Sequence, residues 1–173
     1  MMNYPLLVHQ FLERASTFFA DKEIVTREGE STHRYNYAEL MRRSSRLSNA
    51  LSGLGVGIGD RVGTFGWNTY RHLEAYFAAP TMGAVLHTIN IRLFTEDLVY
   101  IIYHAGDKVI LVDPDLVPIL EPLVPQLESV EHFIIMTGDR NFSTALPSAH
   151  IYEDLLSGVT DEYSPVRLDE NSP

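Results

Sequence analysis

Polar side chains stand at the ends of two apolar runs, where ligands bind in many parallel sheets. Asn68 follows the run that ends at Phe65, and His87, Asn90 and Arg92 close the next run along the chain. In open α/β sheets the carboxyl ends of neighbouring strands line the ligand crevice. Amide, imidazole and guanidinium groups at such an edge can bind a substrate through hydrogen bonds and charge. We therefore take these four side chains as substrate-side candidates.

Each candidate also has a purely structural interpretation. Asn68 can cap the helix that we expect to begin at Thr69, because an Asn side chain accepts a hydrogen bond from the first helical turn. The Asn and Thr side chains of segment 87–93 can equally satisfy backbone groups of a local loop. We favour the cap for Asn68, and for the second segment both interpretations stay open.

A glycine-rich stretch looks like a phosphate-binding loop but stands in the wrong context. Its glycines are Gly53, Gly55, Gly57 and Gly59. A phosphate loop needs its glycines after a strand and before a helix, so that the helix N-terminus points at the phosphate. Here the expected order is helix, glycines, strand. The stretch therefore predicts a helix-to-strand turn.

Two acidic residues, Asp113 and Asp115, follow a predicted strand as a phosphoacceptor carboxylate would. Such a site also needs an acidic pair after the first strand to hold a divalent ion, and this chain has Arg27-Glu28 there. We therefore interpret the two aspartates as caps of the next helical turn. The 7 histidines include no i, i+4 pair and there is no Gly-x-Ser-x-Gly elbow, so the sequence predicts neither a metal site nor a catalytic residue.

Composition limits the class of protein and its partners. The 173 residues are 45% hydrophobic and carry a net charge of −10. An acidic surface repels phosphate backbones, so no nucleic-acid partner is expected. Cysteine is absent, which excludes disulfides and thiolate chemistry. No apolar stretch is long enough for a transmembrane segment and no signal peptide is visible, so we expect a cytoplasmic protein.

Hydrophobic periodicity predicts an N-terminal helix and hairpin followed by alternating strands and helices. The expected helices cover 6–19, 36–53, 69–82, 95–105, the proline-broken 116–127 and 151–156. The expected strands cover 24–26, 32–35, 61–65, 84–87, 109–112 and 133–136. Helix caps are expected at Asn36, with Glu39 in a capping-box position, and at Thr95.

Short apolar strands separated by helices indicate a mainly parallel β-sheet with helices on both faces. The predicted fold class is therefore α/β, with an additional N-terminal helix and β-hairpin. We expect one subdomain over 1–160. The polar residues 161–173 are expected to form a loose linker.

The order of several sequence blocks resembles the adenylate-forming (AMP-binding) enzymes. Four blocks carry this resemblance: Tyr35–Leu40, Leu54–Val62, Ala75–Val85 and Asn90–Leu93. Two segments, His72–Phe77 and Leu86–Asn90, look most like the medium- and long-chain fatty acyl-CoA synthetases. The likeness runs from about residue 6 to about residue 168. One departure is Ile91, where the family usually has proline.

The resemblance implies an N-terminal subdomain of a fatty acid–CoA ligase. Such enzymes use ATP and Mg to convert a fatty acid to an acyl-adenylate and then transfer the acyl group to coenzyme A. The family's phosphate loop, magnesium-binding glutamate and catalytic lysine have no matching positions here. We therefore expect this chain alone to be inactive, with no cofactor bound tightly. Arg92 is expected either to meet an anionic group of coenzyme A or to form a surface salt bridge.

Two alternatives to this assignment remain. The chain can be a stand-alone interaction or oligomerisation module derived from such an enzyme. It can also belong to an adenylate-forming ligase for aryl or amino acids. Because apolar surface that packs against the rest of the enzyme would be exposed in this chain alone, we expect a homo-oligomer.

Overall fold

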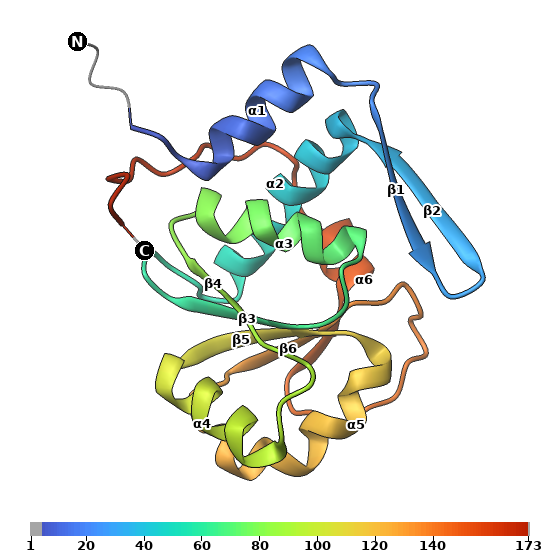
Figure 1. The fold of residues 1–173 in the computed structure, drawn as a ribbon, viewed down its shortest axis with the longest axis vertical. Helices are drawn as coiled ribbons and strands as arrows, with labels where there is room; N and C mark the ends of the chain where they lie inside the picture. The colour runs from blue at the N-terminus through green and yellow to red at the C-terminus, as the bar shows by residue number, and fades with distance from the viewer. Residues whose placement is uncertain (1–4, 173) are drawn as a thin grey trace.

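From Arg61 onward, apolar runs alternate with amphipathic segments, and the structure arranges them as a parallel sheet between helices (Figure 1). This computed structural model describes residues 5–172. The helices are α1 (Val8–Phe18), α2 (Tyr37–Gly53), α3 (Tyr70–Thr81), α4 (Thr95–Ala105), α5 (Val117–Leu120) and α6 (Tyr152–Ser157). The strands are β1 (Glu23–Glu28), β2 (Ser31–Asn36), β3 (Arg61–Phe65), β4 (Val85–Thr88), β5 (Asp107–Val112), β6 (His132–Ile135) and β7 (Ala149–Ile151).

The main sheet has the strand order β4-β3-β5-β6-β7, and every neighbouring pair is parallel. The predicted α/β class with a mainly parallel sheet is therefore confirmed. Strand β7 was not expected from the sequence, because three residues are too few to show a period. Prolines break the segment after β5 as predicted, into α5 and two flanking 3₁₀ turns, η1 (Pro114–Leu116) and η2 (Glu121–Gln126).

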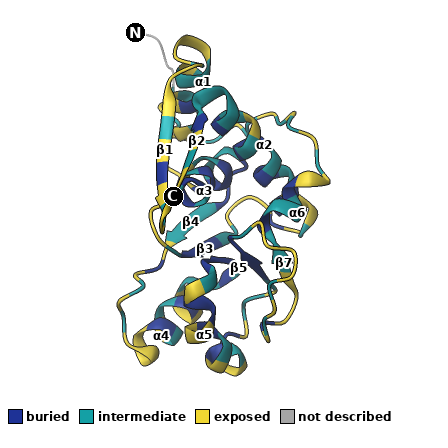
Figure 2. Ribbon diagram, turned by 90° about the vertical axis from the view of Figure 1, so that its right-hand side faces the viewer, coloured by how far each residue is buried: buried dark blue, intermediate teal, exposed yellow. Residues whose placement is uncertain are grey.

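Helices cover both faces of this sheet (Figure 1). One face packs against α2, α3 and α6 through a cluster that includes Val109 and Leu111 of β5. The other face packs against α4 and α5 and includes the alternate residues Ile110 and Val112. The two-residue period of β5 therefore supplies both cores, and Figure 2 shows the buried residues concentrated in and around the strands.

The N-terminal helix and hairpin form a smaller unit beside α2 and α3 (Figure 1). Strands β1 and β2 pair antiparallel from Glu23↔Asn36 to Glu28↔Ser31. Helix α1 buries Leu12 in a third cluster with Tyr35, Leu40 and Tyr70. This arrangement confirms the predicted helix and β-hairpin.

Helix boundaries agree with the sequence at one expected cap and differ at another. The Asn36 side chain accepts a hydrogen bond from the Glu39 amide, 2.9 Å away, which confirms this cap. The expected cap at Thr95 is wrong: Phe94 holds the N-cap position and Thr95 is the first helical residue. A left-handed Gly106 ends α4 with φ of 66°, a conformation that glycine adopts without steric cost.

A buried ionic network joins α2, α3 and α6. Glu74, whose side chain is fully buried, accepts hydrogen bonds from Arg43 at 2.7 Å and from the Tyr152 hydroxyl at 2.6 Å. Arg43 also binds both carboxylate oxygens of Glu153, at 2.9 and 3.0 Å. Burial raises the pKa of Glu74, and Arg43 opposes that shift. The network therefore keeps a buried carboxylate paired.

The C-terminal segment has no helix or strand between 158 and 172 but contacts the rest of the fold. Asn49 donates to the carbonyls of Thr160 and Glu162. Farther along, the Val166 amide donates to Thr81, and Glu170 accepts from the Leu6 amide. These contacts lead the segment back along α2 and α3 to the start of α1.

Candidate functional site

The carboxyl ends of β3, β4, β5 and β6 carry two hollows that share Trp67. The β4-side hollow, about 360 Å³, is lined by Gly66, Trp67, Asn68, His72, Tyr76, Thr88, Ile89, Asn90 and Ile91. The β6-side hollow, about 490 Å³, is lined by Arg27, Glu28, Gly29, Trp67, Thr69, Arg71, Asp113, Pro114, Asp115, Met136 and Thr137. Both lie at the edge of the sheet where parallel α/β folds bind ligands.

Two aspartates fix Trp67 between the hollows. The Asp113 carboxylate accepts the Trp67 backbone amide at 2.6 Å, and the Asp115 carboxylate accepts the indole N–H at 2.9 Å. The preceding Gly66 leaves room for this contact, since a Cβ there would lie 2.9 Å from Asp113 Oδ2 and 2.4 Å from Met136 Cε. A larger residue at this position would force the side chains of Met136 and Asp113 to shift.

The capping interpretation of Asp113 and Asp115 is therefore wrong. Asp113 holds the N-cap position of η1, but no side chain caps that turn. Its side chain instead reaches across the sheet to Trp67. Burial raises the pKa of Asp113 to about 6, against the opposing effect of the Trp67 amide hydrogen bond.

Each charged side chain that lines the β6-side hollow makes a hydrogen bond within the protein. Arg71 donates to Glu28 at 3.0 Å, to Glu153 at 2.9 Å and to the Met136 carbonyl at 3.3 Å. Arg27 donates to the Gly29 carbonyl. The hydrogen bonds of Arg71 thus link α3 to the hairpin, to α6 and to the residue that follows β6.

The β4-side hollow brings two of the four candidates together. Asn68 and Asn90 both line it, beside the half-exposed rings of Trp67 and Tyr76. The preferred capping role of Asn68 is wrong, because Thr69 holds the N-cap position of α3 and no side-chain hydrogen bond caps this helix. The structure shows no hydrogen bond from the Asn68 amide group to residues 5–172, so this group is free to meet a ligand.

The segment after β4 forms a local turn around Asn90. The Asn90 side-chain oxygen accepts the Arg92 backbone amide at 3.0 Å. The Asn90 oxygen thus satisfies a backbone group of its own loop, as the structural interpretation of segment 87–93 predicted. The amide nitrogen of the same side chain makes no hydrogen bond within the described residues 5–172, and the exposed Arg92 side chain does not line the hollow.

His87 lies outside the hollow. Its Nδ1 is 2.7 Å from an oxygen of the buried Asp107, the first residue of β5. The structure therefore brings Asn68 and Asn90 into one site and directs His87 toward the sheet interior.

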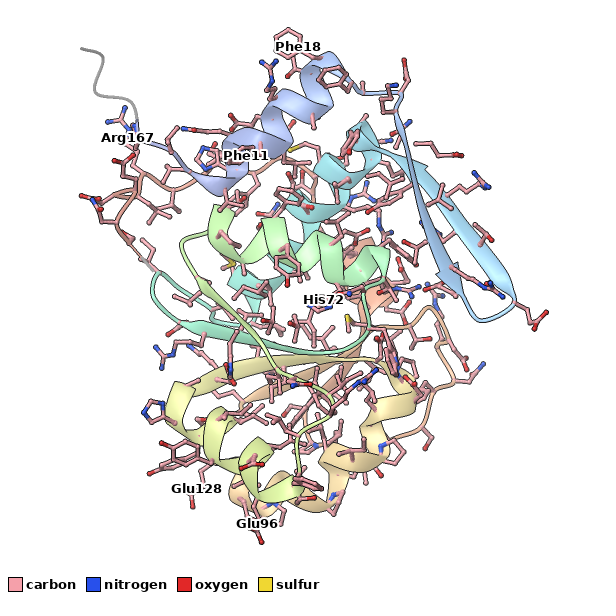
Figure 3. The ribbon with its side chains drawn as sticks, in the orientation of Figure 1. Phe11, Phe18, His72, Glu96, Glu128 and Arg167 are labelled. Atoms are coloured by element: carbon pink, nitrogen blue, oxygen red, sulfur yellow. The ribbon has the colours of Figure 1, made fainter. Side chains whose placement is uncertain are left out.

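His72 lines the β4-side hollow and was not expected there from sequence. Its Nδ1 lies 3.0 Å from the Trp67 carbonyl, which fixes Nδ1 as the protonated nitrogen because a carbonyl only accepts. Its ring stacks on Tyr76, with centroids 5.1 Å apart. Figure 3 shows His72 on the side of α3 that faces the sheet. The sequence could have predicted that His72 and Tyr76 lie together, since residues four apart share one helix face.

Burial lowers the pKa of His72, so its imidazole is neutral near pH 7. Within residues 5–172, no group of three His, Asp or Glu side chains is placed to hold a metal ion. The β4-side hollow therefore offers amide and aromatic groups without a fixed charge. Such a surface suits hydrogen bonding and stacking with a planar, polar ligand.

Comparison with known proteins identifies the class of this fold and site. The family profile described as AMP-binding enzyme matches residues 12–172. In structure, the chain is similar to the anthranilate CoA ligase AuaEII solved with anthranoyl-AMP, with a TM-score of 0.84 at 19% identity, covering 99% of this chain and 31% of that one. The chain belongs to the AMP-binding enzyme family, the adenylate-forming superfamily predicted from its sequence blocks.

Within this family the chain is similar in sequence to acyl-CoA ligases. It is 46% identical over 175 aligned positions to a long-chain-fatty-acid–CoA ligase of Thermus thermophilus. It is 42% identical over 176 positions to a 3-methylmercaptopropionyl-CoA ligase of Ruegeria lacuscaerulensis. Each alignment covers 99% of this chain, which spans 30% and 32% of the two relatives and matches their N-terminal part.

Proposed function

We propose that this chain is the N-terminal subdomain, residues 1–160 with a linker at 161–173, of a fatty acid–CoA ligase. The parent enzyme would use ATP and Mg to activate a fatty acid as its acyl-adenylate and would then form the coenzyme A thioester. The observation that carries this proposal is the 46% identity to a long-chain-fatty-acid–CoA ligase over 99% of the chain. A cytoplasmic location remains a prediction of the composition.

The substrate-side role falls to the β4-side hollow. Asn68 and Asn90 present side-chain amide groups there between exposed aromatic rings. Arg92, exposed beside the hollow, is the cation that an anionic group of coenzyme A would meet. His87 acts indirectly, because its Nδ1 is occupied by Asp107. Magnesium is not assigned to residues of this chain, since the described residues offer no suitable group of ligands.

The acyl group is the least constrained part of the proposal. The two relatives at 46% and 42% identity are named for different acids, a long-chain fatty acid and 3-methylmercaptopropionate. Similarity over this region therefore does not fix the acid, and an aryl or amino acid ligase is the alternative.

Pyrophosphate release from ATP tests the proposal. It is measured with a panel of fatty, aryl and amino acids, using this chain and the complete product of the gene that encodes it. We expect release with fatty acids by the complete product and none by the 173-residue chain. Release with aryl or amino acids alone would overturn the fatty acid assignment. Release by the chain itself would contradict its predicted inactivity.

Exposed apolar side chains on α1 favour a second role as an oligomerisation surface. Phe11 is 70% exposed and Phe18 is 67% exposed, and Figure 3 shows Phe18 at the outer end of the helix. Apolar groups that recur along one helix face commonly mark a contact surface. We propose a homo-oligomer through this face.

Light scattering at high concentration tests the oligomer. We expect a mass above the 19.6 kDa of one chain, reduced to that of a monomer when Phe11 and Phe18 are both changed to Ser. A monomeric mass for the unsubstituted chain would contradict the proposal. Leu12→Ser is no suitable control, because Leu12 is buried in the core.

A further inference from the structure

An ionic bridge joins the edge strand of the sheet to a strand that is not its neighbour. His87 lies on β4 and Asp107 on β5, and β3 runs between these strands. The His87 Nδ1 and the Asp107 Oδ2 are nevertheless 2.7 Å apart. The intervening position on β3 is Gly63, which pairs with His87. The absence of a side chain there allows the two to meet.

Gly63 is surrounded closely enough that the bridge depends on it. A Cβ at this position would lie 3.3 Å from Asp107 Cγ, 3.1 Å from Ile89 Cδ1 and 3.2 Å from Ile110 Cγ1. These distances are shorter than ordinary carbon contacts of about 3.5–4.0 Å. Even alanine would therefore press on the carboxylate and on the residue that follows β4.

We propose that the His87–Asp107 bridge fastens the edge strand β4 to the sheet and so positions the segment that ends in Asn90. Strand β4 has four residues and pairs only with β3 among the described strands. Beyond it, the Ile89 amide donates to the Thr64 carbonyl at 2.9 Å. The bridge adds a second attachment, from β4 directly to β5. His87 is thus a positioning residue for the β4-side hollow.

The charges around the bridge make this attachment dependent on pH. The hydrogen bond to Asp107 raises the pKa of His87 above its ordinary value of 6.5. Burial raises the pKa of Asp107, with His87 and then Arg61 acting in the opposite direction. Arg61 on β3 is the other charge acting on this pair, and its guanidinium donates to the carbonyls of Ala105 and Gly106.

The direction of the pH effect follows from proton linkage. Because folding raises the pKa of His87, the folded protein binds this proton more tightly than the unfolded chain. While Asp107 is ionised, the contribution of the His87 proton is fully present below pH 6.5 and is lost as the pH rises through the higher folded pKa. Burial lowers the pKa of His33, His72 and His150, which gives the opposite trend. Global unfolding therefore cannot isolate the bridge.

Two local measurements on the protein isolate it: an NMR titration of the His87 imidazole, and the exchange protection of the Ile89 amide between pH 6 and 9. We expect His87 to titrate above 6.5. We expect Ile89 protection to fall about fivefold over this range, because a charged hydrogen bond is roughly twice as strong as a neutral one.

His87→Asn places an amide donor near the position of Nδ1 and does not titrate, so Ile89 protection should be independent of pH. His87→Ala should lower protection at every pH, and Asp97→Asn, an exposed change on α4, should leave the wild-type profile unchanged. A wild-type His87 that titrates at or below 6.5, or the same pH profile in His87→Asn, would overturn the proposal. The role of the bridge in positioning a substrate site rests on the proposed function. Both measurements omit substrate, so they test the bridge independently of that function.

Discussion

The two hollows beside Trp67 lie at the same edge of one sheet yet differ in how their polar groups are used. In the β6-side hollow, each charged lining residue makes a hydrogen bond within the protein, and Arg71 alone makes three. In the β4-side hollow, the polar groups are uncharged, and the Asn68 side chain has no partner among residues 5–172. Trp67 belongs to both.

The polar groups of the β6-side hollow are thus used within the protein, whereas those of the β4-side hollow can bind a ligand. A buried polar group costs stability unless it is paired, so the buried Asp113 and the largely buried Arg71 stabilise the fold through their contacts. The β4-side amides are near water and need no partner within the protein. Substitutions in or behind the β6-side hollow should therefore change stability, whereas substitutions in the β4-side hollow should change ligand binding.

The largest expected effect is on the ionic network behind the β6-side hollow. Arg43→Met leaves the carboxylate of Glu74 buried without its cation, and breaking such a pair costs about 3–5 kcal/mol. Urea unfolding measures this loss. The matched control is Arg42→Met, since Arg42 is exposed and pairs with Glu39 at the surface, where a pair contributes at most about 1 kcal/mol. Equal losses in the two variants would contradict the account.

Crowding at the end of β3 should produce the next largest effect. Gly66→Ala places a Cβ against Met136 and Asp113, and overpacking of this kind typically costs about 1–3 kcal/mol. Gly53→Ala is the control, because a Cβ there meets no atom within 4 Å. The free energy of unfolding should fall for the first variant and stay level or rise for the second. A neutral Gly66→Ala would show that Trp67 is held less firmly than we infer.

The Asp113 carboxyl should give an effect of comparable size that depends on pH. Folding raises its pKa from 3.8 to about 6, so its contribution is greatest below pH 3.8 and is lost as the pH rises through about 6. Asp113→Asn still offers an oxygen to the Trp67 amide but cannot ionise. The difference in unfolding free energy between wild type and variant should therefore shift in favour of the variant between pH 4 and 7. A constant difference would sink this assignment.

The smallest effect on stability should come from the β4-side hollow. Asn68→Ala removes no hydrogen bond within residues 5–172, and such surface changes typically stay within about 0.5 kcal/mol. Thermal unfolding of the variant should match wild type. A substantial loss would mean that Asn68 is structural, as the capping interpretation held.

The sequence predicted the fold better than it predicted the contacts. The apolar runs at 61–65 and 109–112 gave β3 and most of β5, because buried parallel strands need continuous apolar residues. Strand β7 was missed because three residues show no period. The resemblance of the sequence blocks also predicted the family that the comparisons show.

The site was only partly predictable because its contacts cross from one strand to another. The sequence predicted that Asn68 and Asn90 follow two successive strands, and the structure shows that these strands are paired neighbours. The contacts of Asp113 with Trp67 and of His87 with Asp107 join residues 46 and 20 positions apart. The first depends on Gly66, directly after β3, and the second on Gly63 within β3. Spacing along the chain does not reveal such pairs; strand order and register do.

The central claim is that the β4-side hollow faces the coenzyme A of the proposed ligase, and the KM for coenzyme A tests it most directly. The measurement compares the complete gene product with its Asn68→Ala, Asn90→Ala double variant, after thermal unfolding has shown equal stability. We predict that the KM for coenzyme A rises about tenfold, the equivalent of about 1.4 kcal/mol and within the range of one or two lost hydrogen bonds. An unchanged KM in a stable, active double variant would contradict the account.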